Sequence, residues 1–192
     1  VGDLVARVKA MLMGEGTRAF AAGVDLRMPT GDENNLLGSG ALGVRPFAAV
    51  SSSIGPFAPH ANVAYQWNGE SALAGDVRAG ETADLPDQFT YVVGADVLMA
   101  QRLSVIFDFF GQRVIDSPRI VPRTSTRTGV AGSVTLDDIF FTSESFWTSS
   151  GGFGLKANLA PRLLVAFNLR FAIGNGGLTD RLSPLIGMEW AF

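Results

Sequence analysis

The clearest structural signal lies in residues 163–173, which read LLVAFNLRFAI. Every second side chain in this stretch is apolar, whereas Asn168 and Arg170 occupy positions between the apolar ones. A period of two places the apolar side chains on one face of a β-strand and the polar ones on the other. Residues 182–192 repeat the pattern, so the sequence predicts two consecutive strands with faces of opposite chemistry.

The same alternation recurs along the whole chain of 192 residues. We assign it to nine segments: residues 1–13, 17–29, 40–53, 57–69, 87–99, 102–116, 146–159, 161–174 and 182–192. These segments exceed the strands of soluble proteins, which average about 5–6 residues. They are long enough for a tilted strand to cross a membrane, which takes about 9–11 residues.

The connections between these segments alternate strictly between short and long. Short ones fall at residues 14–16, 54–55, 100–101 and 160–161, and long ones at 30–39, 70–86, 117–145 and 175–181. Outer-membrane barrels have short periplasmic turns and longer external loops. The sequence therefore predicts an all-β fold, an antiparallel up-and-down transmembrane β-barrel in the bacterial outer membrane.

We expect residues 1–192 to form a single β-barrel domain. The strand pattern is present from the first residues, and the first and ninth segments run in the same direction. An even-stranded barrel then needs further strands. We therefore expect the chain to be the C-terminal part of a longer protein with about twelve strands.

Composition excludes several other classes of protein. Apolar residues make up 47% of the chain, yet none of its apolar runs approaches the about 20 residues that a membrane-spanning helix needs. The chain contains no cysteine, which excludes disulfides and thiolate metal sites. The net charge of −3 offers no basic patch for nucleic acid, so we expect no nucleic-acid partner. We also expect no metal site and no cofactor.

The segment 117–145 is the longest predicted loop, and we expect it to be external. It is rich in serine and threonine, and Arg119, Arg123 and Arg127 precede its acidic residues. Two alternatives stay open for it: a mobile external loop, or a plug that folds inward and narrows the barrel.

Alternation assigns one set of polar side chains to the barrel interior. These predicted lumen-lining residues are Arg7, Asp25, Arg27, Arg45, His60, Asn62, Asp96, Asp108, Lys156, Asn168, Arg170 and Glu189. A lumen with charges of both signs can select small polar solutes. Alternatively, the charges pair with one another and hold the wall together.

Hairpin geometry allows two of these pairings to be predicted. A three-residue turn at residues 14–16 sets Asp3 opposite Arg27 and places Arg7 diagonally to Asp25. Later in the chain, Lys156 and Glu189 are expected at a similar height, two strands apart.

The strand ends carry further signals. Tyr65 and Trp67 are expected at the outer rim, and Trp190 and Phe192 at the inner rim, as interfacial aromatic girdles.

Pro46 and Pro59 lie inside predicted strands and lack an N–H for the ladder. We therefore expect bulges or locally broken pairing at the two prolines.

Trp190 and Phe192 also end an alternating apolar strand, and Phe192 is the last residue. This ending resembles the C-terminal signal that the barrel-assembly machinery recognises in outer-membrane proteins.

A narrower resemblance covers about the first third of the chain. Residues 26–32 (LRMPTGD), 35–40 (NLLGSG) and 59–65 (PHANVAY), with Gly2-Asp3-Leu4 and Lys9, resemble a family of outer-membrane transporters named for the meta-pathway of phenol degradation. The resemblance implies an outer-membrane channel, with hydrophobic or aromatic compounds among the solutes to consider. No single substrate follows from it.

Two other kinds of site are weighed and not favoured. His60 is the only histidine, and Ser51 and Asn62 lie near it by register, as a phospholipase-type barrel would require. We expect no enzyme, because His60 is placed at the periplasmic rim of the lumen. Residues 29–35 cluster oxygen-bearing side chains, but a polar external turn is favoured over a calcium site because the spacing does not match a calcium loop.

The function expected from the sequence is passive or facilitated diffusion of small solutes through an outer-membrane channel. The alternative is a closed structural barrel whose external loops bind a partner protein. Expected partners are the lipid bilayer, the barrel-assembly machinery during insertion and a small-molecule solute; a partner protein or a homo-oligomer stays open.

Overall fold

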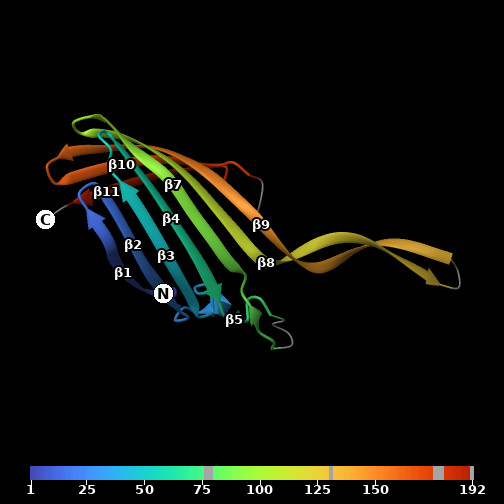
Figure 1. The fold of residues 1–192 in the computed structure, drawn as a ribbon. Coiled ribbons are helices and arrows are strands. Elements are labelled where there is room, and N and C mark those ends of the chain that lie inside the picture. The colour runs from blue at the N-terminus through green and yellow to red at the C-terminus, as the bar shows by residue number, and fades with distance from the viewer. Residues whose placement is uncertain (76–79, 130–131, 175–179, 191–192) are drawn as a thin grey trace.

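The structure is a computed structural model that describes residues 1–75, 80–129, 132–174 and 180–190 (Figure 1). Its main element is one antiparallel sheet of nine strands in which each strand pairs with its neighbours along the chain. The strands are β1 (Leu4–Glu15), β2 (Arg18–Met28), β3 (Gly43–Ser52), β4 (Phe57–Asn68), β7 (Asp87–Ala100), β8 (Leu103–Gly129), β9 (Gly132–Ala160), β10 (Leu163–Ala172) and β11 (Leu182–Trp190). The prediction of an all-β, up-and-down antiparallel fold with nine long strands is confirmed.

The sheet is curled but open. Its order runs from β1 to β11, and these two strands form its edges without pairing with each other. A closed barrel is therefore not observed in the described part of the chain. The long connections all leave from one end of the sheet and the tight turns from the other, as the alternation of connection lengths predicted.

The segment 117–145 is not the loop that was expected. Most of it belongs to a β-hairpin formed by β8 and β9, paired from Ser117 opposite Glu144 to Gly129 opposite Gly132. Threonine, valine and isoleucine are frequent on both strands, and such residues favour extended backbone. The hairpin projects beyond the end of the sheet rather than folding over its concave face, so it is no plug (Figure 1).

The register of the first hairpin also differs from the prediction. Arg7 lies directly opposite Asp25, and Val5 rather than Asp3 lies opposite Arg27. The turn lies at Gly16 and Thr17 instead of residues 14–16, which moves the pairing by three residues, and a register shift between Met11 and Met13 takes one of these three back. Such a bulge inserts an extra residue into one strand, and a count from the turn alone misses it.

Proline has the expected effect at Pro46. It pairs with Val24 of β2, but the ladder between β3 and β4 is interrupted at Arg45 and Pro46. Pro59 pairs with Ala95 of β7, but the ladder between β3 and β4 ends at the neighbouring pair, Ser51 opposite His60. A backbone N–H points to one neighbouring strand only, so each proline removes at most one ladder hydrogen bond.

In their described parts, the other long connections carry little regular structure. A short 3-10 helix, η1 (Glu33–Asn35), lies between β2 and β3, and β5 (Glu70–Ser71) pairs with β6 (Ala83–Asp84) between β4 and β7. Within the described ranges, no helix has the length and apolar character needed to span a membrane.

The sheet has no conventional core. Its buried apolar residues are few and mostly small, among them Ala21, Ala64 and Ile106. The large apolar side chains instead cover the convex face and remain open, with Ile186 at 79% exposure. No second layer packs against this apolar face among the described residues, which leaves a large exposed apolar surface.

Candidate functional site

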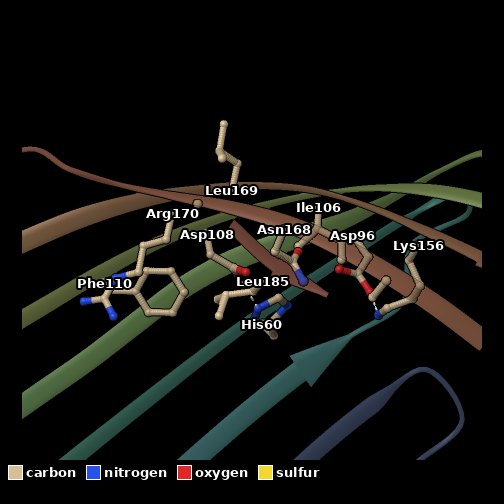
Figure 2. Close-up of a pocket in the computed structure, with 12 residues that line it drawn as sticks. His60, Asp96, Ile106, Asp108, Phe110, Lys156, Asn168, Leu169, Arg170 and Leu185 are labelled. Atoms are coloured by element: carbon tan, nitrogen blue, oxygen red, sulfur yellow. Dashed lines mark hydrogen bonds and ion pairs between the residues drawn. The ribbon is translucent and has the colours of Figure 1, made fainter. Parts of the chain in front are cut away.

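The candidate site is the polar, concave face of the sheet. The register places every predicted lumen-lining residue on this one face, from Arg7 on β1 to Glu189 on β11. In Figure 2 the polar side chains point to one side of the sheet, whereas Leu169 points to the opposite side. Alternation alone therefore predicted the composition of this face.

A hollow of about 500 Å³ lies on the polar face and is lined by residues of β4 and of β7 to β11. Five of the charged or polar residues that line it are His60, Asp96, Asp108, Lys156 and Arg170, contributed by β4, β7, β8, β9 and β10 (Figure 2). The residues come from distant parts of the chain because successive antiparallel strands lie side by side. We call this group the central cluster.

His60 and Asp108 form a pair across an intervening strand. Nε2 of His60 lies 3.0 Å from Oδ1 of Asp108, and both residues sit opposite Gly94 of β7. A Cβ at Gly94 would lie 2.8 Å from His60 Nε2 and would also meet the Asp108 carboxylate. Glycine is required here because the two side chains meet directly over its backbone.

Lys156 and Asp96 form a second pair of this kind. Nζ of Lys156 on β9 donates a hydrogen bond of 2.8 Å to Oδ2 of Asp96 on β7, over β8. The sequence placed Lys156 near Glu189 and did not predict its contact with Asp96. A rule based on directly opposed residues misses such pairs, because these two backbones lie two strand spacings apart, about 10 Å.

Arg170 of the central cluster and Asn168 line the hollow from β10. The guanidinium of Arg170 lies 5.4 Å from the centre of the Phe110 ring and donates to Ser150 Oγ at 3.3 Å. Asn168 lies opposite Gly154, where a Cβ would collide with its side-chain oxygen. Glycine thus again leaves room for a polar side chain of the neighbouring strand.

A second charged group lies on β1, β2 and β3. Arg7 donates two hydrogen bonds to Asp25, of 2.6 Å and 2.7 Å, and Nη1 of Arg45 lies 3.8 Å from the same carboxylate. Asp25 is only 5% exposed. A buried carboxylate needs such partners, since its desolvation would otherwise destabilise the fold.

Asp3 holds the connection between β2 and β3 against the start of β1. Its carboxylate accepts hydrogen bonds from the Ser39 hydroxyl and from the backbone N–H groups of Ser39 and Gly31. Arg27 lies 3.8 Å from it. The hydrogen bond from the Ser39 hydroxyl has the largest effect and that from the Ser39 N–H the next largest, and both lower the pKa of Asp3 below its ordinary value of 3.8.

Aromatic residues form a row on the apolar face near the long-loop end. Tyr65, Phe89, Arg113 and Trp147 lie directly opposite one another across β4, β7, β8 and β9. The Trp147 ring lies 6.4 Å from the Phe89 ring and 5.8 Å from the Arg113 guanidinium, and Trp67 packs 4.8 Å from Tyr65. The sequence predicted the two β4 members and missed Phe89 and Trp147, which the same period-two count would have found.

At the other rim, Trp190 is the last residue of β11, lies opposite Leu163 and belongs to the apolar face. Phe192, the other half of the predicted assembly signal, lies outside the described residues.

Among the described residues, no side-chain hydrogen bond joins the candidate nucleophile Ser51 to His60. Ser51 lies opposite His60, but the described hydrogen bond of the imidazole goes to Asp108 instead. Within the described ranges, no three His, Cys, Asp or Glu residues are grouped closely enough to hold a metal ion. In the predicted polar turn, the Asp32 carboxylate caps η1 by accepting from the N–H of Asn35.

Comparison with known proteins adds no relative. No protein-family model matches the chain. No curated protein matches it either. The resemblance to the transporter family of the phenol meta-pathway therefore stays a prediction.

Proposed function

We propose that this chain forms the wall of a channel in the bacterial outer membrane, through which small solutes cross by passive or facilitated diffusion. One observation carries the proposal. The convex face of the sheet is apolar, well exposed and uncovered by any other described element, while the concave face is polar. Lipid outside and water inside would satisfy both faces at once.

Strand length and rim chemistry support the same arrangement. β4 has 12 residues, which at a tilt of about 45° cover roughly 28 Å along the membrane normal. The row of Tyr65, Phe89 and Trp147 near the long-loop end suits the interfacial aromatic girdle of such barrels. Trp190 is the corresponding candidate at the tight-turn end.

A channel requires the curled sheet to close. The free backbone groups of β1 and β11 would be unsatisfied in lipid, where edges do not persist. Because the two edge strands run in the same direction, antiparallel closure takes an odd number of additional strands, and three would complete the barrel of about twelve expected from the sequence. Insertion of such a barrel would involve the barrel-assembly machinery.

Charges of both signs on the concave face suit small polar solutes. Two hollows of a few hundred cubic ångströms lie on this face. One is beside the ion pair of Lys156 and Asp96, and the other is beside that of Arg7 and Asp25. Phe47 and Phe110 also line these hollows, so solutes with a hydrophobic or aromatic part belong to the class considered.

The test is single-channel conductance of the full chain in a planar bilayer, before and after deletion of residues 118–143. Discrete conductance steps are expected in both forms, because the hairpin of β8 and β9 projects away from the concave face. Silence in both forms, with the protein shown to be inserted, would refute the channel.

The projecting hairpin favours a second candidate function, binding of a partner protein. Ile120 and Ile139 are well exposed on one face of this hairpin, and Val134 and Leu136 on the other. Apolar side chains exposed at the end of a sheet are typical of interaction sites. In this case deletion of residues 118–143 would abolish capture of a partner without altering the barrel.

A further inference from the structure

A second hollow, of about 310 Å³, lies on the concave face at the end of the sheet formed by β1 to β4. Its cationic wall consists of Arg7 and Lys9 from β1 and Arg45 from β3. Asn62 of β4 and Thr90 of β7 line the opposite side. None of these residues belongs to the central cluster, so the hollow is a separate site.

The charges around this hollow are not balanced. Three cationic groups, those of Arg7, Lys9 and Arg45, face one carboxylate, that of Asp25, which leaves a net charge of +2. Nε and Nη2 of Arg7 both donate hydrogen bonds to the Asp25 carboxylate, and Nη1 of Arg45 lies 3.8 Å from Oδ2 of Asp25. Among the described contacts, Lys9 has no acidic partner.

The central cluster lacks this excess of positive charge. The two cationic side chains there, Lys156 and Arg170, equal in number the two carboxylates, Asp96 and Asp108. Close contacts link Lys156 to Asp96 and His60 to Asp108. The uncompensated positive charge is therefore local to the hollow near β1. A concave, partly desolvated surface concentrates such a field on a bound anion.

The hollow also has an apolar part. The ring of Phe47 lies over Gly23, where a side chain would occupy the space of the ring. The Arg7 guanidinium lies 5.2 Å from the centre of this ring. Ala64, opposite Phe47, and Ala49 continue the apolar surface between the cationic wall and Asn62.

We propose that this hollow binds small organic carboxylates. The carboxylate lies between Lys9 and Arg45, whose donors are least engaged by the protein, and the hydrocarbon part lies against Phe47 and Ala64. Charge-assisted hydrogen bonds to a carboxylate are stronger than neutral ones and favour anions over alcohols of the same shape. The assignment deepens the proposed channel, since it rests on the concave face being open to solutes, and names the class of solute that is retained there.

The experiment measures binding of butyrate to the folded full chain in detergent by titration calorimetry, with butanol and butylammonium as the neutral and cationic counterparts. The variant Lys9→Gln/Arg45→Gln is expected to bind butyrate at least about tenfold more weakly. The matched control Lys156→Gln/Arg170→Gln removes the same charge from the central cluster and is expected to bind butyrate as the unchanged chain does. Circular dichroism verifies that each variant folds.

A second variant tests the apolar part without changing charge. Phe47→Ala is expected to weaken binding of butyrate and to leave that of acetate unchanged, since acetate barely reaches the ring. Equal binding of butanol and butyrate, or butyrate binding unaffected by Lys9→Gln/Arg45→Gln, would overturn the proposal.

Planar-bilayer conductance separates the failure of this site from that of the channel. Conductance without butyrate binding would remove the carboxylate site and leave the channel in place. Butyrate binding without conductance would remove the channel and leave the carboxylate site in place.

Discussion

Lys156 and Asp96 are joined over the intervening strand β8, with 2.8 Å between Nζ and Oδ2. The two side chains are 33% and 29% exposed. The pair therefore belongs to a partly desolvated setting, in which a hydrogen-bonded ion pair stabilises more than it does at an open surface.

A double-mutant cycle with Lys156→Met and Asp96→Asn should reveal this coupling. We expect a coupling of about 0.5–1 kcal/mol in the free energy of unfolding, measured with urea in lipid vesicles. The exposed pair Arg119 and Glu144, on the projecting hairpin, is the control and should couple by about half a kcal/mol or less. Equal couplings would contradict the role of the intervening strand.

Gly94 should resist even a small side chain. Gly94→Ala would force apart His60 and Asp108, and we expect it to lower the free energy of unfolding by about 1–3 kcal/mol. Gly187→Ala on β11 is the matched control, since no atom lies within 4 Å of its added Cβ, and should change stability by about 0.5 kcal/mol or less. His60 is the only histidine, so its ring signals in NMR report the local change; unshifted signals in Gly94→Ala would argue against the pair.

Asp25→Asn should be among the more damaging single changes on the concave face. The substitution removes the negative charge between the Arg7 and Arg45 guanidinium groups, at a residue that is only 5% exposed. We expect a loss of about 2–3 kcal/mol in the free energy of unfolding. Glu144→Gln, which breaks an exposed pair, serves as the comparison; a loss as small as that of Glu144→Gln would show that the Asp25 pairs contribute little.

Acid should loosen the connection between β2 and β3. Since the pKa of Asp3 is lowered on folding, the carboxylate stabilises the folded state above its ordinary pKa of 3.8, and this contribution is lost as the pH falls through the lower folded pKa. The amide signals of Gly31 and Ser39 should therefore shift in NMR below about pH 4. Asp3→Asn should abolish this dependence; an identical titration in Asp3→Asn would assign it to another group.

Tryptophan fluorescence can test the membrane placement. The three tryptophans, Trp67, Trp147 and Trp190, all lie on the apolar face. In variants that keep one tryptophan and replace the others by phenylalanine, lipid brominated near the headgroup should quench more strongly than lipid brominated at the chain end. Strong quenching by aqueous acrylamide, with none by either lipid, would place the apolar face in water.

The strand pattern was predictable because it is local. Period-two alternation needs only neighbouring residues, and it placed residues as far apart as Arg7 and Glu189 on one face correctly. The alternating connection lengths likewise set the up-and-down order. The aromatic row was half found: the same count applies to Phe89 and Trp147, near the starts of segments 87–99 and 146–159, but they were not included in the prediction.

The predictions that were wrong depended on small irregularities. The turn at Gly16 and Thr17 and the shift between Met11 and Met13 together set Arg7 opposite Asp25, and no residue type in that stretch indicates the bulge. The hairpin at residues 117–145 was taken for a loop because its serine, threonine and arginine obscured the alternation. Its cross-strand pairs, such as Arg123 opposite Asp138, become visible only once both strands are aligned.

The chemistry of each face is thus contained in the order of the amino acids, because side chains alternate by backbone geometry alone. The contacts within the concave face are not, because His60 meets Asp108, and Lys156 meets Asp96, over a third strand. Those meetings depend on how adjacent ladders stagger, how the sheet curls and where glycine leaves space. Only the tertiary structure decides these, since each arises from strands that are distant in the chain.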